Sequence, residues 1–293
     1  MPQELLTLAD LLTRPEFLAG LGAGALATVG VAAARRPEGR GWGLALTAAT
    51  LVGLSLTVGQ RLSLVVGLVL LAAGGWLLDR PGPSTGQPYN PGWPLIVAGA
   101  ILVALRGGLS DLVWPWVVGP VVIVGFGSAL GLWRTGPHRH LLGPMVLVTA
   151  FGIWATVPNT DTARVLLGAS TPLALATVRP IAARIGPAGA FALAGLLVAI
   201  AIDGGQTRPA SIVGAWASIG LLALLPLTVV VTGTKPRLSG AGVLVGHALL
   251  VLVASRVVGL RHDALPAAAG VVVLWLIGAF VAMVVGPPDP GNV

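Results

Sequence analysis

Cysteine is absent from this 293-residue chain, and charged residues are scarce. Without cysteine the chain has no disulfide, no thiolate nucleophile, no iron–sulfur cluster and no zinc site built from thiolates. Asp, Glu, Lys and Arg make up 9% of the residues, whereas a soluble domain carries about 25%. Because so few charges cannot cover a wetted surface, we expect most of the surface to face lipid.

Two motifs that would indicate chemistry are also missing. The sequence has neither a Walker A lysine motif nor HExxH, which argues against ATP-driven transport within this chain and against zincin chemistry. His138 and His140 alone make a poor metal site, so we expect no metal and no cofactor. His247 lies inside a predicted helix, where it is either a proton relay or, more commonly, a hydrogen-bond partner of a neighbouring helix.

Long apolar segments dominate what is present. The chain is 55% hydrophobic with a mean hydropathy of +0.92, and its apolar runs are about 16–23 residues long, the length of membrane helices rather than of barrel strands. We predict an all-α integral membrane protein, a polytopic bundle of about 11 (10–12) transmembrane helices with short loops. An interfacial segment (1–16) precedes a single helical domain (17–286) and a C-terminal tail (287–293). The predicted spans are 17–34, 42–58, 62–78, 93–105, 112–133, 141–157, 163–178, 186–202, 211–232, 240–255 and 265–285.

The distribution of basic residues predicts the orientation. With the N-terminus outside and the C-terminus cytoplasmic, the inner connections hold ten Arg and Lys residues and the outer side holds seven, in the sense of the positive-inside rule. The basic inner face is expected to attract anionic lipids. The net charge of +7 therefore indicates membrane topology rather than a nucleic-acid partner. Arginine far outnumbers lysine, and Ala, Gly and Val are abundant, which indicates a GC-rich, bacterial genome. For a multi-pass protein of such a cell we expect the plasma (inner) membrane.

Three GxxxG pairs, Gly20/Gly24, Gly127/Gly131 and Gly242/Gly246, allow close approach between helix backbones. We use them as a sign of tight packing, because several such matches arise by chance in a chain with 42 glycines.

The seventh predicted helix carries the polar residues with the strongest functional interpretation. Asp161 and Arg164 are three residues apart and share a face of its first turn. Ser170, Thr171 and Pro172 interrupt its short apolar run, and short, proline-interrupted spans indicate transporter binding sites. The alternative, which we weight more heavily, is a proline-kinked helix with a packing role.

Outer turns repeatedly combine an acid with an arginine. Asp203/Arg208 and Asp161/Arg164 each follow an apolar run directly, and ionisable groups below the headgroups are functional candidates. The candidate substrate path therefore comprises Asp161, Arg164, Ser170, Thr171, Asp203 and Arg208. For most outer pairs we prefer ion pairing between adjacent turns, worth under about 1 kcal/mol each.

Ser255, Arg256 and His262 give the pattern SRx5H at an outer helix end. This fragment resembles one motif of the phosphatidic-acid phosphatase type 2 family, in which Arg and His handle the phosphate. The resemblance covers only 255–262: Pro266 stands where that family has its acid, and its other motifs are missing. We treat it as coincidental and keep Arg256 and His262 as outer-face phosphate candidates.

Three functions fit these features. The first is a permease- or flippase-like carrier with its site near the broken seventh helix. The second is a membrane-embedded enzyme that acts on a lipid-linked substrate at the outer face. The third is a non-catalytic subunit of a complex with other membrane proteins. The carrier leads, and the sequence assigns no catalytic residue.

Overall fold

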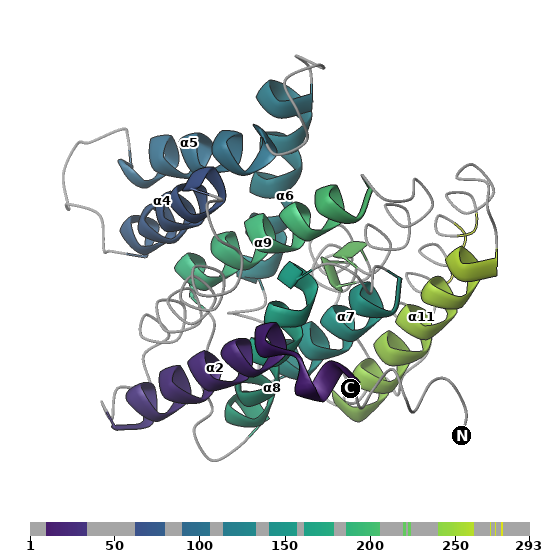
Figure 1. Cartoon of the computed structure of the whole chain (residues 1–293). Coiled ribbons are helices and arrows are strands. Elements are labelled where there is room, and N and C mark those ends of the chain that lie inside the picture. Colours follow the sequence, from purple (N-terminus) through teal and green to yellow (C-terminus); the bar gives the residue numbers. More distant parts are fainter. Residues whose placement is uncertain are drawn as a thin grey trace, which may run out of the picture.

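The described part of the chain is all-helical, which confirms the predicted all-α class at that level (Figure 1). The computed structural model describes residues 10–33, 62–79, 90–105, 114–132, 141–156, 161–178, 186–205 and 240–260, with isolated positions between 219 and 277. No strand occurs within these ranges. The predicted second span (42–58), most of the ninth and eleventh, most of segment 1–16 and the tail 287–293 lie outside the described residues.

Eight α-helices have bounds that the structure gives in full. They are α2 (Pro15–Ala33), α4 (Leu62–Leu78), α5 (Gly92–Ala104), α6 (Gly119–Leu132), α7 (Leu142–Thr156), α8 (Asp161–Val178), α9 (Pro187–Gly205) and α11 (Gly240–Leu260). The bounds of α4 are those predicted. Within the described residues, no helix is both long enough and apolar enough to cross a membrane.

Two differences from the predicted helices occur at prolines. The predicted span 112–133 begins with a π-helical turn, Trp114–Val118, before α6. Pro120 has no N–H with which to continue the α-helical hydrogen bonding into that turn. In α8, by contrast, the helix continues through Pro172, so the predicted interruption is not a break in the helix.

Helix α9 lies in the middle of the bundle. Nearly all of its residues from 188 to 200 are buried, and it packs against α4, α5 and α6 (Figure 1). Phe191 of α9 touches Gly127 of α6 and meets Trp93 of α5 edge-on, with ring centroids 6.2 Å apart. The all-round burial of α9 explains why it has no polar face.

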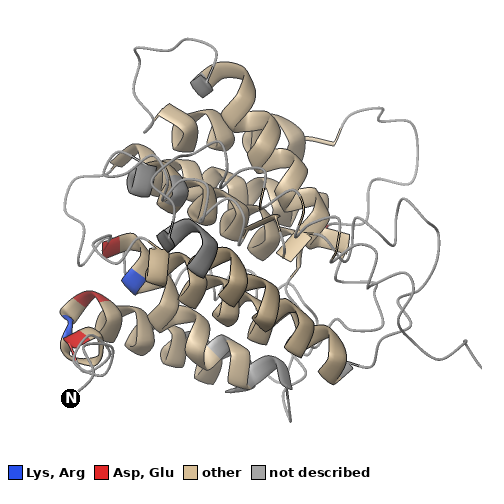
Figure 2. Cartoon of the chain, turned by 90° about the vertical axis from the view of Figure 1, so that its right-hand side faces the viewer, with Lys and Arg blue, Asp and Glu red and all other residues tan. Residues whose placement is uncertain are grey.

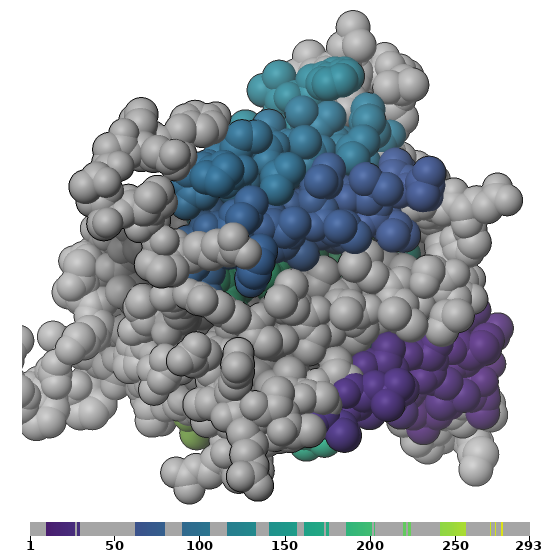
Figure 3. Space-filling model, turned by 90° about the vertical axis from the view of Figure 1, so that its left-hand side faces the viewer, coloured from purple at the N-terminus to yellow at the C-terminus, as the bar shows by residue number. Residues whose placement is uncertain are grey.

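Glycines set the distance between α4 and α5. A Cβ atom added at Gly67 would lie 2.9 Å from the carbonyl oxygen of Gly99, and one added at Gly74 would lie 2.7 Å from that of Gly92. The two backbones are therefore in direct contact, and the pairing order makes the helices antiparallel. Figure 3 shows them as one continuous blue surface.

Backbone contact at glycines also joins α2 to α8, which are far apart in the sequence. Gly20 abuts the carbonyl of Val165, and Gly168 abuts that of Phe17. A Cβ at Gly24 would lie 2.8 Å from the carbonyl oxygen of Ala169. Because Gly20 faces Val165 and Gly24 faces Ala169, the two helices run parallel. Gly20 and Gly24 are one of the predicted GxxxG pairs, and α8 is their partner.

Candidate functional site

The first turn of α8 carries the ion pair that the sequence spacing indicates. Arg164 donates from Nη1 to Oδ1 of Asp161 at 3.3 Å. The Arg164 side chain is 14% exposed, and that of Asp161 is 43% exposed. The pair therefore lies partly inside the bundle, with its carboxylate reaching outward.

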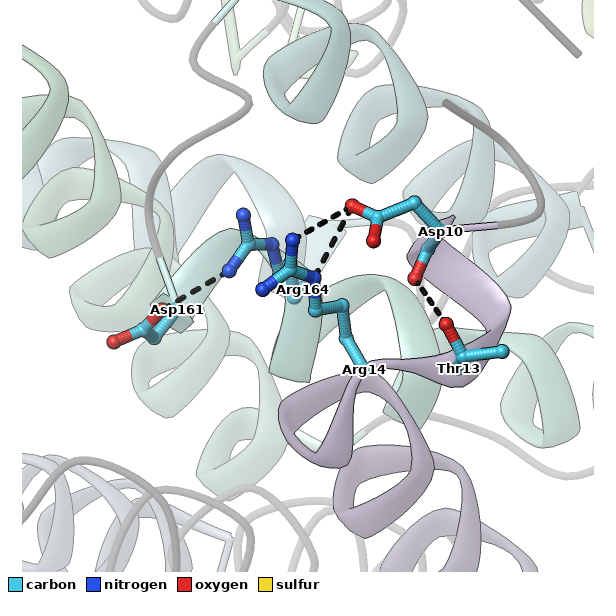
Figure 4. Close-up of polar contacts among 5 residues, drawn as sticks. All are labelled: Asp10, Thr13, Arg14, Asp161 and Arg164. Carbon is cyan, nitrogen blue, oxygen red and sulfur yellow. Dashed lines mark hydrogen bonds and ion pairs between the residues drawn. The ribbon is translucent and has the colours of Figure 1, made fainter. Parts of the chain in front are cut away.

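A second ion pair comes from the turn that precedes α2 (Figure 4). Arg14 donates to Oδ2 of Asp10 from Nε at 3.1 Å and from Nη2 at 2.9 Å. Thr13 donates its hydroxyl to the carbonyl oxygen of Asp10 at 2.9 Å. The side chain of Leu11, in the same turn, is buried in the core. This apolar anchor holds the charged turn in place.

Packing of α2 on α8 brings the two ion pairs to one end of the bundle (Figures 2 and 4). The hydrogen bond to Asp10 raises the pKa of Arg14 above its ordinary value, and the charges of Asp10, Glu16 and Asp161 add to this effect. Carboxylates from both chain segments therefore contribute to the electrostatic environment of Arg14. We call Asp10, Arg14, Glu16, Asp161 and Arg164 the charged cluster.

Glu16 is the member of the charged cluster that lacks a matched partner. Its Oε2 atom is buried and has no hydrogen-bond partner. A buried carboxylate oxygen without a donor is costly in free energy. Sequence reasoning missed Asp10, Arg14 and Glu16 as site residues. The available signal was that 10–16 concentrates charge in a chain that has few charges.

The hydroxyl groups in the middle of α8 are bonded within the helix. Ser170 is buried, and its Oγ donates to the carbonyl oxygen of Leu167 at 3.1 Å. Thr171 donates to the same oxygen at 3.0 Å. The Leu167 carbonyl lies one residue before that of Gly168, which has no helical hydrogen-bond donor because Pro172 lacks an N–H. Both hydroxyls thus bind backbone in this structure, and their role in a substrate path stays a prediction.

His247 of α11 binds a neighbouring helix. Its Nε2 lies 3.0 Å from Oγ1 of Thr149 in α7, and both residues are buried. Of the two roles that the sequence leaves open for His247, the contact with Thr149 corresponds to the hydrogen bond with a neighbouring helix.

The structure does not describe the side chains of the remaining candidates. Asp203 lies in the last turns of α9 and Arg256 in the last turns of α11, and the positions of their side chains are not described. Arg208 and His262 lie outside the described residues. Over the ranges that the structure covers, no group of three or more His, Cys, Asp or Glu side chains could hold a metal ion.

Comparison of the chain with models of protein families and with curated proteins finds no match. Interpretation of the site therefore rests on its own geometry and charge.

Proposed function

We propose that the chain is a multi-pass protein of the bacterial plasma membrane and acts as a permease- or flippase-like carrier, with its polar path at the charged cluster. The observation that carries the proposal is the convergence of Asp10, Arg14 and Glu16 with Asp161 and Arg164. Two segments about 150 residues apart supply these charges, and 9% of the chain is charged. Ionisable groups within the spans of a membrane protein mark substrate or ion pathways, and Arg164, whose side chain is 14% exposed, is the member of the charged cluster that fits this description.

Helix directions support the multi-pass topology. In a chain that crosses the membrane eleven times, two odd-numbered spans run parallel, whereas an odd and an even span run antiparallel. α2 and α8 correspond to the first and seventh spans and are parallel. α4 is the third span, and its glycine contacts make it antiparallel to α5, the fourth span. It is also antiparallel to α9, the eighth span, because Gly75 faces Ala188 while Leu68 and Leu71 face Gly195.

Outward-facing apolar side chains support a lipid environment. Leu26 of α2, Leu62 of α4 and Leu175 of α8 are 76%, 73% and 71% exposed. Large hydrophobic side chains are also exposed on α5, α6, α7 and α11. Exposed large apolar side chains on so many helices of one bundle are in keeping with contact with membrane or with protein.

The test of the carrier is uptake into liposomes that contain the purified protein. A mixture of small polar metabolites is offered, and mass spectrometry identifies those that accumulate relative to empty liposomes. We expect Asp161→Asn to abolish uptake while the protein still folds, because the substitution removes the charge that pairs with Arg164. No accumulation with the unmodified protein, or equal accumulation with the variant, contradicts the proposal.

A second candidate is a non-catalytic subunit of a membrane complex. The observation that favours it is the packing of α8, where Ser170 and Thr171 both bind the Leu167 carbonyl and Gly168 abuts α2. This arrangement gives the middle of α8 a structural role. Mild-detergent purification from the native membrane distinguishes the two, because a subunit is recovered with stoichiometric partners and a carrier of this kind is recovered alone.

A further inference from the structure

The helices with given bounds fall into two groups that pack closely within themselves. The first unit comprises α2, α7, α8 and α11, and the second unit comprises α4, α5, α6 and α9 (Figure 1). Among these described helices, no closely packed pair joins one unit to the other. Neither unit is a continuous stretch of sequence, so the division does not follow a boundary along the chain.

Close contacts at glycines hold the second unit together. Besides the glycines that join α4 to α5, Gly75 of α4 abuts the start of α9, where an added Cβ atom would lie 2.6 Å from the carbonyl oxygen of Pro187. Gly127 of α6 receives the ring of Phe191 from α9. A helix cannot slide along such a contact without a collision, so we treat these four helices as one body.

Glycine contacts and one buried hydrogen bond do the same in the first unit. Gly20, Gly24 and Gly168 join α2 to α8, and the hydrogen bond between Thr149 and His247 joins α7 to α11. α7 also packs along α8 and so connects the two pairs. All members of the charged cluster lie in α8, in α2 or in the turn before α2. The charges therefore keep their relative positions when this unit moves as a body.

The two units meet through apolar side chains. They share one hydrophobic core, which contains Met145 of α7 and Leu166 of α8 from the first unit and Ile123 of α6 and Leu196 of α9 from the second. By contrast, the close helix contacts at described glycines all stay within a unit. Packed apolar side chains allow small sliding and tilting between helices, whereas backbone contact at glycine does not.

We propose that the two units are rigid bodies that tilt against each other, and that this motion opens the polar path of the carrier to one side of the membrane at a time. The inference rests on the carrier proposal, because it supplies the conformational change that such a carrier needs. Alternating access is largely the rocking of one bundle of helices against another around a fixed site. The charged cluster is suited to be that site, because one unit carries all of it.

Distances between spin labels test the division. The chain has no cysteine, so paired cysteines introduced at exposed positions are the only labelled sites. Leu26→Cys on α2 with Leu249→Cys on α11 reports on the first unit, and Leu62→Cys on α4 with Val121→Cys on α6 reports on the second. The pairs 26/62 and 121/249 report on the distance between the units. These four side chains are exposed; should Leu249→Cys not fold, Leu252→Cys, which is also exposed and lies about one turn away on α11, replaces it.

Double electron–electron resonance in liposomes gives the distribution of each distance, with and without the metabolite mixture of the uptake assay. We expect both within-unit distributions to be narrow and unchanged by the mixture. Both between-unit distributions should be wider by several ångströms, or have two maxima whose ratio the mixture changes. The inference is overturned if the between-unit distributions are as narrow as the within-unit ones under both conditions, or if the within-unit distributions are equally wide.

The uptake assay separates this inference from the carrier proposal. Variable distances between the units without uptake by the unmodified protein support the moving units and contradict the carrier. Uptake with one fixed between-unit distance supports the carrier and overturns the inference.

Discussion

Gly20 of α2 lies so close to the carbonyl group of Val165 in α8 that no side-chain carbon fits between them. The contact is backbone against backbone, so neither partner can move aside without moving a helix. This approach fixes the level at which the charges at the start of α2 meet those at the start of α8. The geometry of the charged cluster thus depends on a residue that has no side chain.

Replacing Gly20 with alanine should destabilise the protein by about 1–3 kcal/mol, the usual cost of overpacking. The added methyl group would collide with the Val165 carbonyl, and this cost outweighs the gain of up to about 1 kcal/mol that alanine brings to a helix. Chemical unfolding in detergent, followed by tryptophan fluorescence, measures the difference.

Gly22→Ala is the matched control for that measurement. Gly22 lies in the same helix, and nothing described lies within 4 Å of a Cβ atom added there. Its replacement should be neutral or slightly stabilising. Equal losses at Gly20 and Gly22 would show that the α2–α8 contact is not the source of the effect.

Local features of the fold could be predicted from the sequence, whereas contacts between helices could not. Continuous apolar residues between polar turns located Leu62–Leu78 with its observed bounds, and i,i+3 spacing predicted the Asp161–Arg164 pair. The glycine spacing indicated a close approach at Gly20 but not its partner, because a GxxxG pattern carries no information about the facing helix. For the same reason the sequence predicted no link between Glu16 and α8.

Arg14→Gln should reduce the order of the turn at 10–14. The substitution removes both hydrogen bonds to Asp10, while Leu11 still anchors the turn in the core. We expect faster amide hydrogen exchange at 10–14 and unchanged exchange in α9, as measured by mass spectrometry. Unchanged exchange at 10–14 would indicate that Leu11 alone orders the turn.

The pH dependence of this effect follows from the direction of the Arg14 pKa shift. Asp10 raises the pKa of Arg14. The contribution of the charged guanidinium to the stability of the turn is therefore complete below the ordinary pKa of arginine, and it is lost only as the pH rises through the raised value. The difference in amide protection at 10–14 between Arg14→Gln and the unmodified protein should therefore be constant from about pH 6 to about pH 9. A difference that shrinks across this range would contradict the assignment of Arg14 as the charged partner.

Thr149→Val should destabilise the contact between α7 and α11. Valine has nearly the shape of threonine but cannot bond to His247, so Nε2 would lose its partner at a buried position. Loss of one partner of a buried hydrogen bond costs about 1–3 kcal/mol. Thr149→Ser keeps the hydroxyl group and removes one methyl group, so it separates hydrogen bonding from packing.

Chemical unfolding of the two variants gives the comparison. If the hydrogen bond holds α11 to α7, Thr149→Val loses more stability than Thr149→Ser, and His247→Ala combined with Thr149→Val loses less than the sum of the single changes. Additive losses in this double-mutant cycle would mean that the two residues do not interact. Among the helices with given bounds α11 packs chiefly against α7, so the coupling measures how firmly α11 is attached to the bundle.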